Sequence, residues 1–292
     1  MRVLVTGGTG FIGQAVCHAL RGAAHTVTIV TRDPAHASGT AVGWDAVGQA
    51  VGAADALVNL AGEPIAAGRW GPVRKEAILQ SRVTATRALV DAAGAAAQRP
   101  GVLVSASAVG YYGARDDELL DETAGSGTGF LAEVCQAWER EASRAEALGL
   151  RVVRLRIGMV LAGDGGALAR MLPPFRAFVG GRLGTGQQWM SWIHRGDLTG
   201  LVVEALANEG YRGAVNATAP QPVRNREFVA ALGRVLVRPA VFPLPAVVLR
   251  AAFGEMAEML LTGQRVLPRA AERLGYRWQH PEVLGALRAS VR

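Results

Sequence analysis

Short apolar runs alternate with helical patterns along the first half of the chain. Apolar strands are predicted at residues 3–5, 26–30, 56–61, 101–105 and 151–160. Between them, apolar residues recur at helical spacing, as at Ile12, Val16 and Leu20. This spacing predicts helices at residues 12–20, 78–93 and 131–148. The alternation is typical of βαβ units and predicts an α/β fold with a doubly wound, Rossmann-type parallel sheet.

The pattern changes a little past the middle of the chain. Prolines and glycines become frequent, as in the pair at 173–174, and the apolar runs become shorter. We therefore expect a main domain over residues 1–161 and a smaller C-terminal α+β lobe, carrying the substrate site, over 162–292. Two later segments keep an apolar pattern and could return to the main sheet, namely 198–207 and 214–216.

A glycine-rich turn follows the first strand and opens the first helix. Gly7, Gly10 and Gly13 are spaced as Gly-x-x-Gly-x-x-Gly. The first glycine permits a tight turn, the second lets a pyrophosphate approach the backbone, and the third lets helix and strand pack closely. The helix N-terminus then offers free N–H groups to phosphates. We expect this turn to bind a dinucleotide through Gly7, Thr9, Gly10, Phe11, Ile12 and Gly13.

The end of the second strand predicts the preferred cofactor. An NAD site usually has a carboxylate here, about 20 residues past the glycines, to accept from the ribose 2′-hydroxyl. This chain has Arg32 at that place, after Thr31, and an arginine fits a 2′-phosphate. Asp33 would be the ribose acceptor if the strand ended later. We therefore expect NADP rather than NAD, with contacts from Thr31 and Arg32.

Two further segments are expected to border the cofactor. The fourth strand ends in Asn59, Leu60, Ala61 and Gly62, where a glycine would let the cofactor pass. An ordinary strand-to-loop turn is the alternative. Arg82 opens a helical stretch and could reach a phosphate with its forked guanidinium. The alternative for Arg82 is a surface arginine paired with Glu76.

Composition narrows the class of protein. The chain has 292 residues, is 50% hydrophobic and carries a net charge of +7. The arginines are scattered, and the apolar stretch at 239–253 is broken by prolines, so we expect neither a nucleic-acid nor a membrane partner. The two cysteines, Cys17 and Cys135, lie in apolar helical patterns without metal-ligand spacing. We expect buried thiols, no metal, and a cytoplasmic location.

The glycine turn and the Asn-Leu-Ala-Gly segment resemble the extended short-chain dehydrogenase/reductase superfamily, in its nucleotide-sugar epimerase-like branch. Further motifs resemble one subfamily over essentially the whole chain, at residues 69–70, 81–83, 105–113, 130–133, 191–194 with 197, 216–220 and 254–255. This is the "epimerase family protein" group, also labelled NAD-dependent epimerase/dehydratase or, in some bacteria, cell-division inhibitor. The resemblance implies a Rossmann domain, a small C-terminal substrate lobe and bound NADP, but no particular substrate.

The resemblance also implies a catalytic set that this chain carries only in part. Enzymes of the superfamily use a serine, and a tyrosine followed four residues later by a lysine. Ser107 matches the serine, but no lysine follows Lys75 anywhere in the chain. Aligning the helix on Glu139 puts Leu131 and Cys135 in the tyrosine and lysine positions. Neither can transfer a proton as that pair does.

Other residues are candidates for the missing chemistry. Tyr111 and Tyr112 follow Ser107 at a strand end that faces the cofactor, and the second lobe presents Trp192 and His194 to the substrate. A structural Tyr-Tyr-Gly turn and a core or loop histidine are the alternatives. The leading hypothesis is hydride transfer on a carbonyl or hydroxyl substrate, with the proton coming from one of these groups or from water. The other hypothesis is a non-catalytic NADP(H)-binding regulatory or interaction protein, linked to cell division.

Overall fold

A seven-stranded parallel sheet forms the centre of the protein. The computed structural model describes residues 1–291. The strand order is β11-β7-β5-β4-β1-β2-β3, and every neighbouring pair is parallel. The strands are β1 (Arg2–Thr6), β2 (Thr26–Val30), β3 (Ala41–Val42), β4 (Ala56–Asn59), β5 (Val102–Ala108), β7 (Arg151–Ile157) and β11 (Gly213–Ala217). Since the order reverses at β1, this is a doubly wound sheet of the Rossmann type, as predicted.

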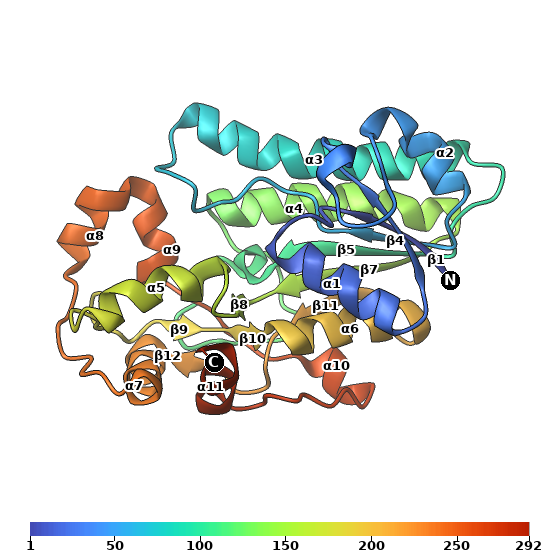
Figure 1. Cartoon of the computed structure of the whole chain (residues 1–292). Helices are drawn as coiled ribbons and strands as arrows, with labels where there is room; N and C mark the ends of the chain where they lie inside the picture. The colour runs from blue at the N-terminus through green and yellow to red at the C-terminus, as the bar shows by residue number, and fades with distance from the viewer. Residues whose placement is uncertain (292) are drawn as a thin grey trace.

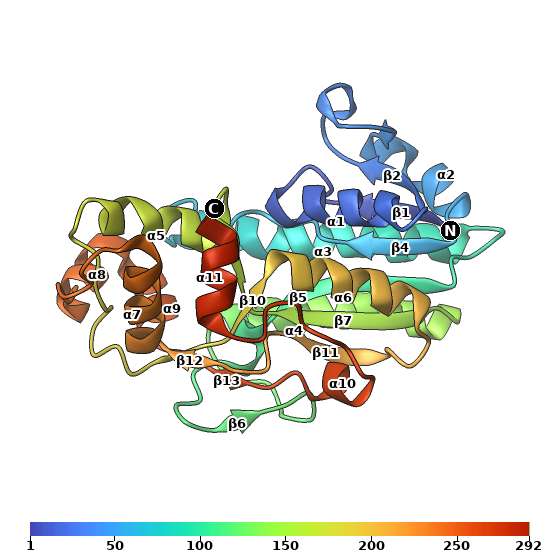
Figure 2. The same ribbon diagram turned by 60° about the horizontal axis from the view of Figure 1, so that its bottom comes forward.

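Helices cover both faces of the sheet, and each face has its own apolar core (Figure 1). On one face α1 (Phe11–Gly22) and α6 (Arg195–Ala207) pack on the strands; Figure 2 shows α6 lying across this face. On the other face lie α2 (Val47–Gly52), α3 (Pro72–Ala95) and α4 (Phe130–Ser143). Burial on both faces explains why the strands are continuous apolar runs rather than alternating ones.

Most of the remaining elements form a lobe at the carboxyl ends of the strands, on the left of Figure 1. Its helices are α5 (Gly166–Arg176), α7 (Asn225–Leu236), α8 (Ala246–Phe253), α9 (Ala257–Leu261) and α11 (Val283–Val291), whereas α10 (Arg269–Arg273) packs beside β11 on the main sheet. Three strand pairs accompany them: β8 (Met159–Leu161) with β10 (Trp192–His194), β9 (Trp189–Met190) with β12 (Val223–Arg224), and β6 (Leu119–Leu120) with β13 (Arg265–Val266). A separate apolar core holds much of this lobe together.

The bounds of several elements differ from the predicted ones, and in two cases the cause is evident. α3 begins at Pro72, six residues before the predicted start, because proline fits the first turn of a helix. The predicted strand at 151–160 is divided at Gly158, where a side chain would lie 2.6 Å from the Ser191 carbonyl oxygen, and β8 pairs with β10 instead. The two later segments that could return to the main sheet lie in α6 and β11, and both belong to its layers.

Three further observations concern membrane-spanning helices, metal sites and the two cysteines. In the described part of the chain, no helix is long and apolar enough to cross a membrane. Within the same residues, no cluster of three or more His, Cys, Asp or Glu side chains has the arrangement of a metal site. Cys17 and Cys135 are both buried free thiols.

Candidate functional site

The glycine turn joins β1 to α1 at the carboxyl edge of the sheet. Gly7 has a φ of 70°, and a side chain on it would lie 2.5 Å from the Leu60 carbonyl oxygen. A side chain on Gly13 would lie 2.0 Å from the Gly7 carbonyl oxygen. Gly10, by contrast, would meet a single atom of the described chain within 4 Å, at 3.3 Å. Two glycines therefore allow close packing, while Gly10 leaves its outer side open for a phosphate.

The helix that follows the turn faces the lobe. The ring of Phe11 packs against Gly165 and Gly166, where added side chains would lie 2.3 and 2.8 Å from it. Thr9 is exposed, and its carbonyl oxygen accepts a hydrogen bond from Gln14. Ile12 is partly buried in the core beneath the turn. The N-terminus of α1 therefore opens between the sheet and the lobe (Figure 1).

Arg32 and Asp33 follow β2 and differ in their contacts. The Asp33 carboxylate is 2.8 Å from Nδ1 of His36, and the Asp33 backbone N–H donates to Thr31 Oγ1. The Arg32 side chain is exposed and has no hydrogen bond or ion pair within residues 1–291. All of its donors are therefore available to a ligand, whereas the carboxylate next to it has a partner.

Asn59 is fully buried at the end of β4. Its side-chain oxygen accepts from Thr6 Oγ1 at 2.7 Å, and its nitrogen donates to Thr86 Oγ1 at 2.7 Å and to Ser105 Oγ at 3.3 Å. The side chain thus joins β1, β4, β5 and α3. Any contact of the 59–62 segment with a cofactor falls to the backbone and to the residues after Asn59.

Arg82 is partly buried against the end of β4. Its guanidinium donates to the carbonyl oxygens of Glu63, at 3.1 and 3.2 Å, and Ile78, at 2.9 Å, and lies 5.2 Å from the Trp138 ring. A side chain on Gly62 would lie 3.0 Å from it. Burial lowers the pKa of Arg82. The alternative of a surface pair with Glu76 is wrong, since no carboxylate of the described chain is within ion-pairing distance of this guanidinium.

A buried polar network lies under the end of β5. Ser107 is 2% exposed and donates to Glu139 Oε1 at 2.7 Å. Glu139 accepts two further hydrogen bonds from Arg156, at 2.9 and 3.0 Å, and both side chains are about 5% exposed. The Ser107 hydroxyl hydrogen is therefore held by a protein carboxylate. Arg156 is the third residue of this network and was not recognised in the sequence, although an arginine among the apolar residues of β7 is an available signal.

Tyr112 belongs to the same network. Its side chain is fully buried, and its hydroxyl is 2.7 Å from Asn216 Oδ1, 3.0 Å from the Asp121 carbonyl oxygen and 3.0 Å from the donor Nη1 of Arg156. Burial raises the pKa of Tyr112 to about 12. This corrects the expectation that Tyr112 faces the cofactor, since its hydroxyl already has protein partners on every side.

Tyr111 lies on the outer side of this network. Its ring stacks on the Arg156 guanidinium at 3.5 Å and meets the Tyr112 ring edge to face at 5.4 Å. The side chain is partly exposed, and within residues 1–291 its hydroxyl has no hydrogen-bond partner. Of the hydroxyl groups proposed for catalysis, this one is free to meet a substrate.

Helix α4 presents no replacement for the missing tyrosine and lysine. Leu131 and Cys135 lie against the turn that carries Tyr111: a side chain on Gly110 would be 3.3 Å from Leu131 and 3.9 Å from the Cys135 sulfur. Burial raises the pKa of Cys135 to about 11, so the thiol keeps its proton at neutral pH. Leu131 and Cys135 occupy the positions expected for the tyrosine and the lysine, but neither can transfer a proton as that pair does.

The two residues expected to bind substrate from the lobe have structural contacts. Trp192 is fully buried and donates from Nε1 to the Gln221 carbonyl oxygen, which corrects the expectation of a substrate contact. His194 caps α6, since its Nδ1 accepts from the Gly196 N–H at 3.1 Å. Burial, His280 and Arg195 lower the pKa of His194 to about 4. His194 is therefore neutral near pH 7 and is a poor proton donor.

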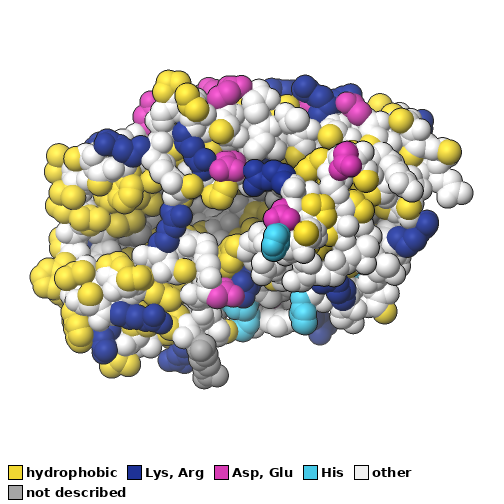
Figure 3. All heavy atoms as spheres, turned by 45° about the horizontal axis from the view of Figure 1, so that its top comes forward, with side chains coloured by type: hydrophobic (Ala, Val, Ile, Leu, Met, Phe, Trp, Pro, Cys, Tyr) yellow, Lys and Arg dark blue, Asp and Glu magenta, His cyan; other side chains and the backbone are white. Residues whose placement is uncertain are grey.

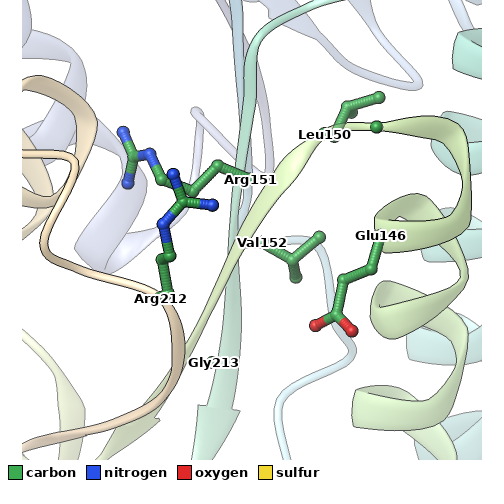
Figure 4. A pocket seen from close by; sticks show the side chains of 7 residues that line it. Glu146, Leu150, Arg151, Val152, Arg212 and Gly213 are labelled. Carbon is green, nitrogen blue, oxygen red and sulfur yellow. The ribbon is translucent and has the colours of Figure 1, made fainter.

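One face of the molecule is hollowed. Figure 3 shows the hollow between the lobe and the sheet, with charged side chains along its rim. A separate cavity of about 290 Å³ lies at the opposite, amino end of β7 (Figure 4), lined by Glu146, Gly149, Leu150, Arg151, Val152, Arg212 and Gly213. There the guanidinium of Arg151 donates to three backbone carbonyl groups, so it is not available to a ligand.

The doubly wound sheet and the glycine turn at its carboxyl edge define a dinucleotide-binding protein of the Rossmann class. Residues 3–217 match the model of the NAD dependent epimerase/dehydratase family, and residues 244–290 match a domain of unknown function, DUF1731. The chain belongs to the NAD dependent epimerase/dehydratase family.

Similar proteins extend over the whole chain. It is 46% identical to the epimerase family protein SDR39U1 homolog, chloroplastic, of Arabidopsis thaliana, over 99% of this chain and 86% of that protein. It is 44% identical to the epimerase family protein Mb2239 of Mycobacterium bovis, over 98% of this chain and 96% of that one. The crystal structure of human epimerase family protein SDR39U1 with NADPH superposes with a TM-score of 0.92 at 37% identity, covering 100% of this chain and 99% of that one.

Proposed function

We propose that this protein is an NADP(H)-dependent oxidoreductase that acts on a carbonyl or hydroxyl group of a small molecule. The pyrophosphate would be held by the backbone of Gly7 and Gly10 and by the N-terminus of α1, and the 2′-phosphate by Arg32. The open side of Gly10 and the free donors of Arg32 support this assignment, as does the NADPH named for the human relative. When bound, NADPH supplies the hydride.

Arg82 takes over part of the missing lysine's role in this proposal. In the superfamily the lysine holds the nicotinamide ribose, and here Cys135 stands in its place. Arg82 donates two hydrogen bonds to the Glu63 carbonyl oxygen, at the end of the segment that follows β4. A partly buried guanidinium without a carboxylate ion pair is unfavourable, and a polar ligand that uses its remaining donors would lower that cost. We assign the ribose hydroxyls to Arg82.

Tyr111 gives or takes the proton in this proposal. The observation that carries the assignment is its free hydroxyl at the end of β5, beside Tyr112 and Ser107, whose hydroxyls are engaged within the protein. The Arg156 guanidinium stacked at 3.5 Å holds the Tyr111 ring in place. Ser107 acts beneath it as a positioning residue, by orienting Glu139 and through it Arg156.

NADPH oxidation across a panel of carbonyls and quinones tests this function. We expect Tyr111→Phe to lower kcat by about 10²–10⁴-fold, the usual contribution of a general acid, while NADPH binding is unchanged. Tyr112→Phe is the matched control, because it removes a hydroxyl one residue away that is buried. Equal rates for Tyr111→Phe and the wild type, or an equal loss in both variants, would contradict the role of Tyr111.

A second candidate is a protein that binds NADP(H) without turnover. In its favour, the hydroxyl groups of Ser107 and Tyr112 are hydrogen-bonded within the protein. Leu131 and Cys135 also stand where the superfamily has its tyrosine and lysine. Tight NADPH binding by calorimetry, with no turnover on the whole panel, would favour this regulatory or interaction role. NADPH oxidation with any substrate of the panel would reject it.

A further inference from the structure

Exposed apolar side chains gather at one end of the C-terminal lobe. Six of them are each at least 50% exposed: Phe178, Val179, Val237, Val241, Phe242 and Val247. We call this surface the apolar end. Soluble monomers rarely expose a contiguous apolar surface of this kind unless something binds to it. Figure 3 shows the hydrophobic side chains crowded at the left of the molecule, where α8 lies in Figure 1.

Backbone contacts make the apolar end one surface rather than two. The Leu244 N–H donates to the Arg182 carbonyl oxygen at 2.8 Å, and the Gly184 N–H donates back to Leu244 at 2.9 Å. The Arg238 guanidinium lies 4.5 Å from the Phe178 ring. The segment after α5 and the segment before α8, some 60 residues apart in the chain, are therefore side by side.

Two of the six residues end helices with a left-handed backbone conformation. Phe178 has a φ of 62° and Val237 a φ of 53°. After α5 the Val179 N–H donates to the Pro174 carbonyl oxygen, and after α7 the Arg238 N–H donates to the Gly233 carbonyl oxygen, as is usual where a helix ends. Phe178 is 50% and Val237 80% exposed, so both helix ends add apolar side chains to this surface.

Arginines surround the apolar end. Arg176, Arg182, Arg238 and Arg250 lie in the same segments as the apolar side chains. Of these four, Arg250 alone has an ion pair within residues 1–291, with Glu258 at 3.1 Å. A second copy of the chain on this surface would bring two arginine rims together, which is unfavourable. An anionic surface complements the rim instead.

We propose that the apolar end docks on a bilayer that contains anionic lipids. The valine and phenylalanine side chains enter the headgroup region, and the arginines meet the lipid phosphates. The contact is peripheral, because no helix of the described chain can cross a membrane. The sequence predicted no membrane partner, since residues 178–179 and 237–247 come together only in the fold.

Co-sedimentation of the full chain with vesicles tests the proposal. We expect binding to phosphatidylcholine vesicles that contain phosphatidylglycerol, weaker binding to pure phosphatidylcholine, and loss of the difference at high salt. The double variant Phe242→Ser, Val247→Ser should bind these vesicles about tenfold more weakly, or more weakly still. The matched control is Leu119→Ser on β6, because Leu119 is 55% exposed and β6 lies away from α8 in Figure 2.

A charge variant completes the design. Arg182→Gln should weaken binding about fivefold, as expected for one arginine near an anionic surface, and Arg212→Gln, exposed at the other end of the molecule, should not. Failure to sediment with anionic vesicles overturns the proposal. So does undiminished binding of the double variant, or a dimer in light scattering that the double variant abolishes, since the surface would then belong to a second copy.

Discussion

At the scale of single residues, Arg32 decides the expected cofactor. It is exposed at the end of β2, and its donors are unused within the described chain, whereas the neighbouring Asp33 carboxylate is hydrogen-bonded to His36. A guanidinium can meet a 2′-phosphate with two parallel hydrogen bonds, and a free ribose hydroxyl gains little from it. In the proposed function, the preference for NADP therefore depends on this one side chain.

We predict that Arg32→Ala lowers the affinity for NADPH about tenfold or more and leaves the affinity for NADH nearly unchanged. The reason is the loss of a charge-assisted contact, which contributes about 1.5–3 kcal/mol. Calorimetric titration of both cofactors against both proteins checks it. Equal affinities for NADPH and NADH in the wild type would show that Arg32 does not read the 2′-phosphate.

At the scale of elements, the pair of Glu139 and Arg156 joins α4 to β7 beneath the candidate site. Both side chains are about 5% exposed, and the pair also holds the hydroxyls of Ser107 and Tyr112. A buried pair contributes little net stability when compared with an apolar replacement, but removing one partner leaves a buried charge uncompensated. The positions of α4 and β7 therefore depend on the whole network, and removing one member is expected to destabilise the others.

We predict that Glu139→Gln lowers the free energy of unfolding by about 3–5 kcal/mol, because Arg156 loses its buried counter-charge. Urea unfolding measures the change. Glu118→Gln is the control, since its pair with Arg115 leaves Glu118 52% exposed and should contribute about 0–1 kcal/mol. Similar small losses of unfolding free energy in both variants would mean that the buried pair stabilises the fold no more than the exposed pair does.

At the scale of the whole molecule, the C-terminal segment is anchored to the N-terminus of α6. The buried carboxylate of Asp197 accepts from the backbone N–H groups of Gln279, at 2.6 Å, and His280, at 3.1 Å. His194 caps the same helix end and packs on His280, with ring centroids 4.0 Å apart. The joint between lobe and sheet thus depends on a histidine that must stay neutral.

We predict that this joint makes stability fall in mild acid. The pKa of His194 is about 4 when folded and near 6.5 when unfolded, so unfolding takes up a proton between these values. Stability present above pH 6.5 is lost as the pH falls, by about 2 kcal/mol between pH 7 and pH 5. The raised pKa of Asp197 has the opposite effect, at pH values above its ordinary value of 3.8, because the folded protein then holds a proton that the unfolded chain releases.

Urea unfolding at pH 7 and pH 5 measures this loss. His194→Asn is the informative variant, because asparagine keeps a capping acceptor but does not titrate. It should lose about 2 kcal/mol less than the wild type between the two pH values. The same loss in both proteins would assign the acid sensitivity to other groups.

Local order along the chain was enough to predict the fold class and the dinucleotide turn. The apolar periodicity and the glycines of the first turn are local signals, because each depends on residues close together in the sequence. The resemblance of the motifs led to the family that the comparisons show. Element ends were less accurate: the strand predicted at 151–160 ends at Ile157 because Ser191, far along the chain, packs on Gly158. No local pattern contains that contact.

The sequence by itself determined the sheet, the cofactor turn and the absence of a tyrosine–lysine pair, since these follow from neighbouring residues or from composition. Only the tertiary structure decided which hydroxyl is free. Tyr111 and Tyr112 are adjacent and chemically alike, but Asn216 and Arg156, from β11 and β7, enclose one and leave the other open. The apolar end arose in the same way, because burial and exposure depend on which distant segments the fold brings together.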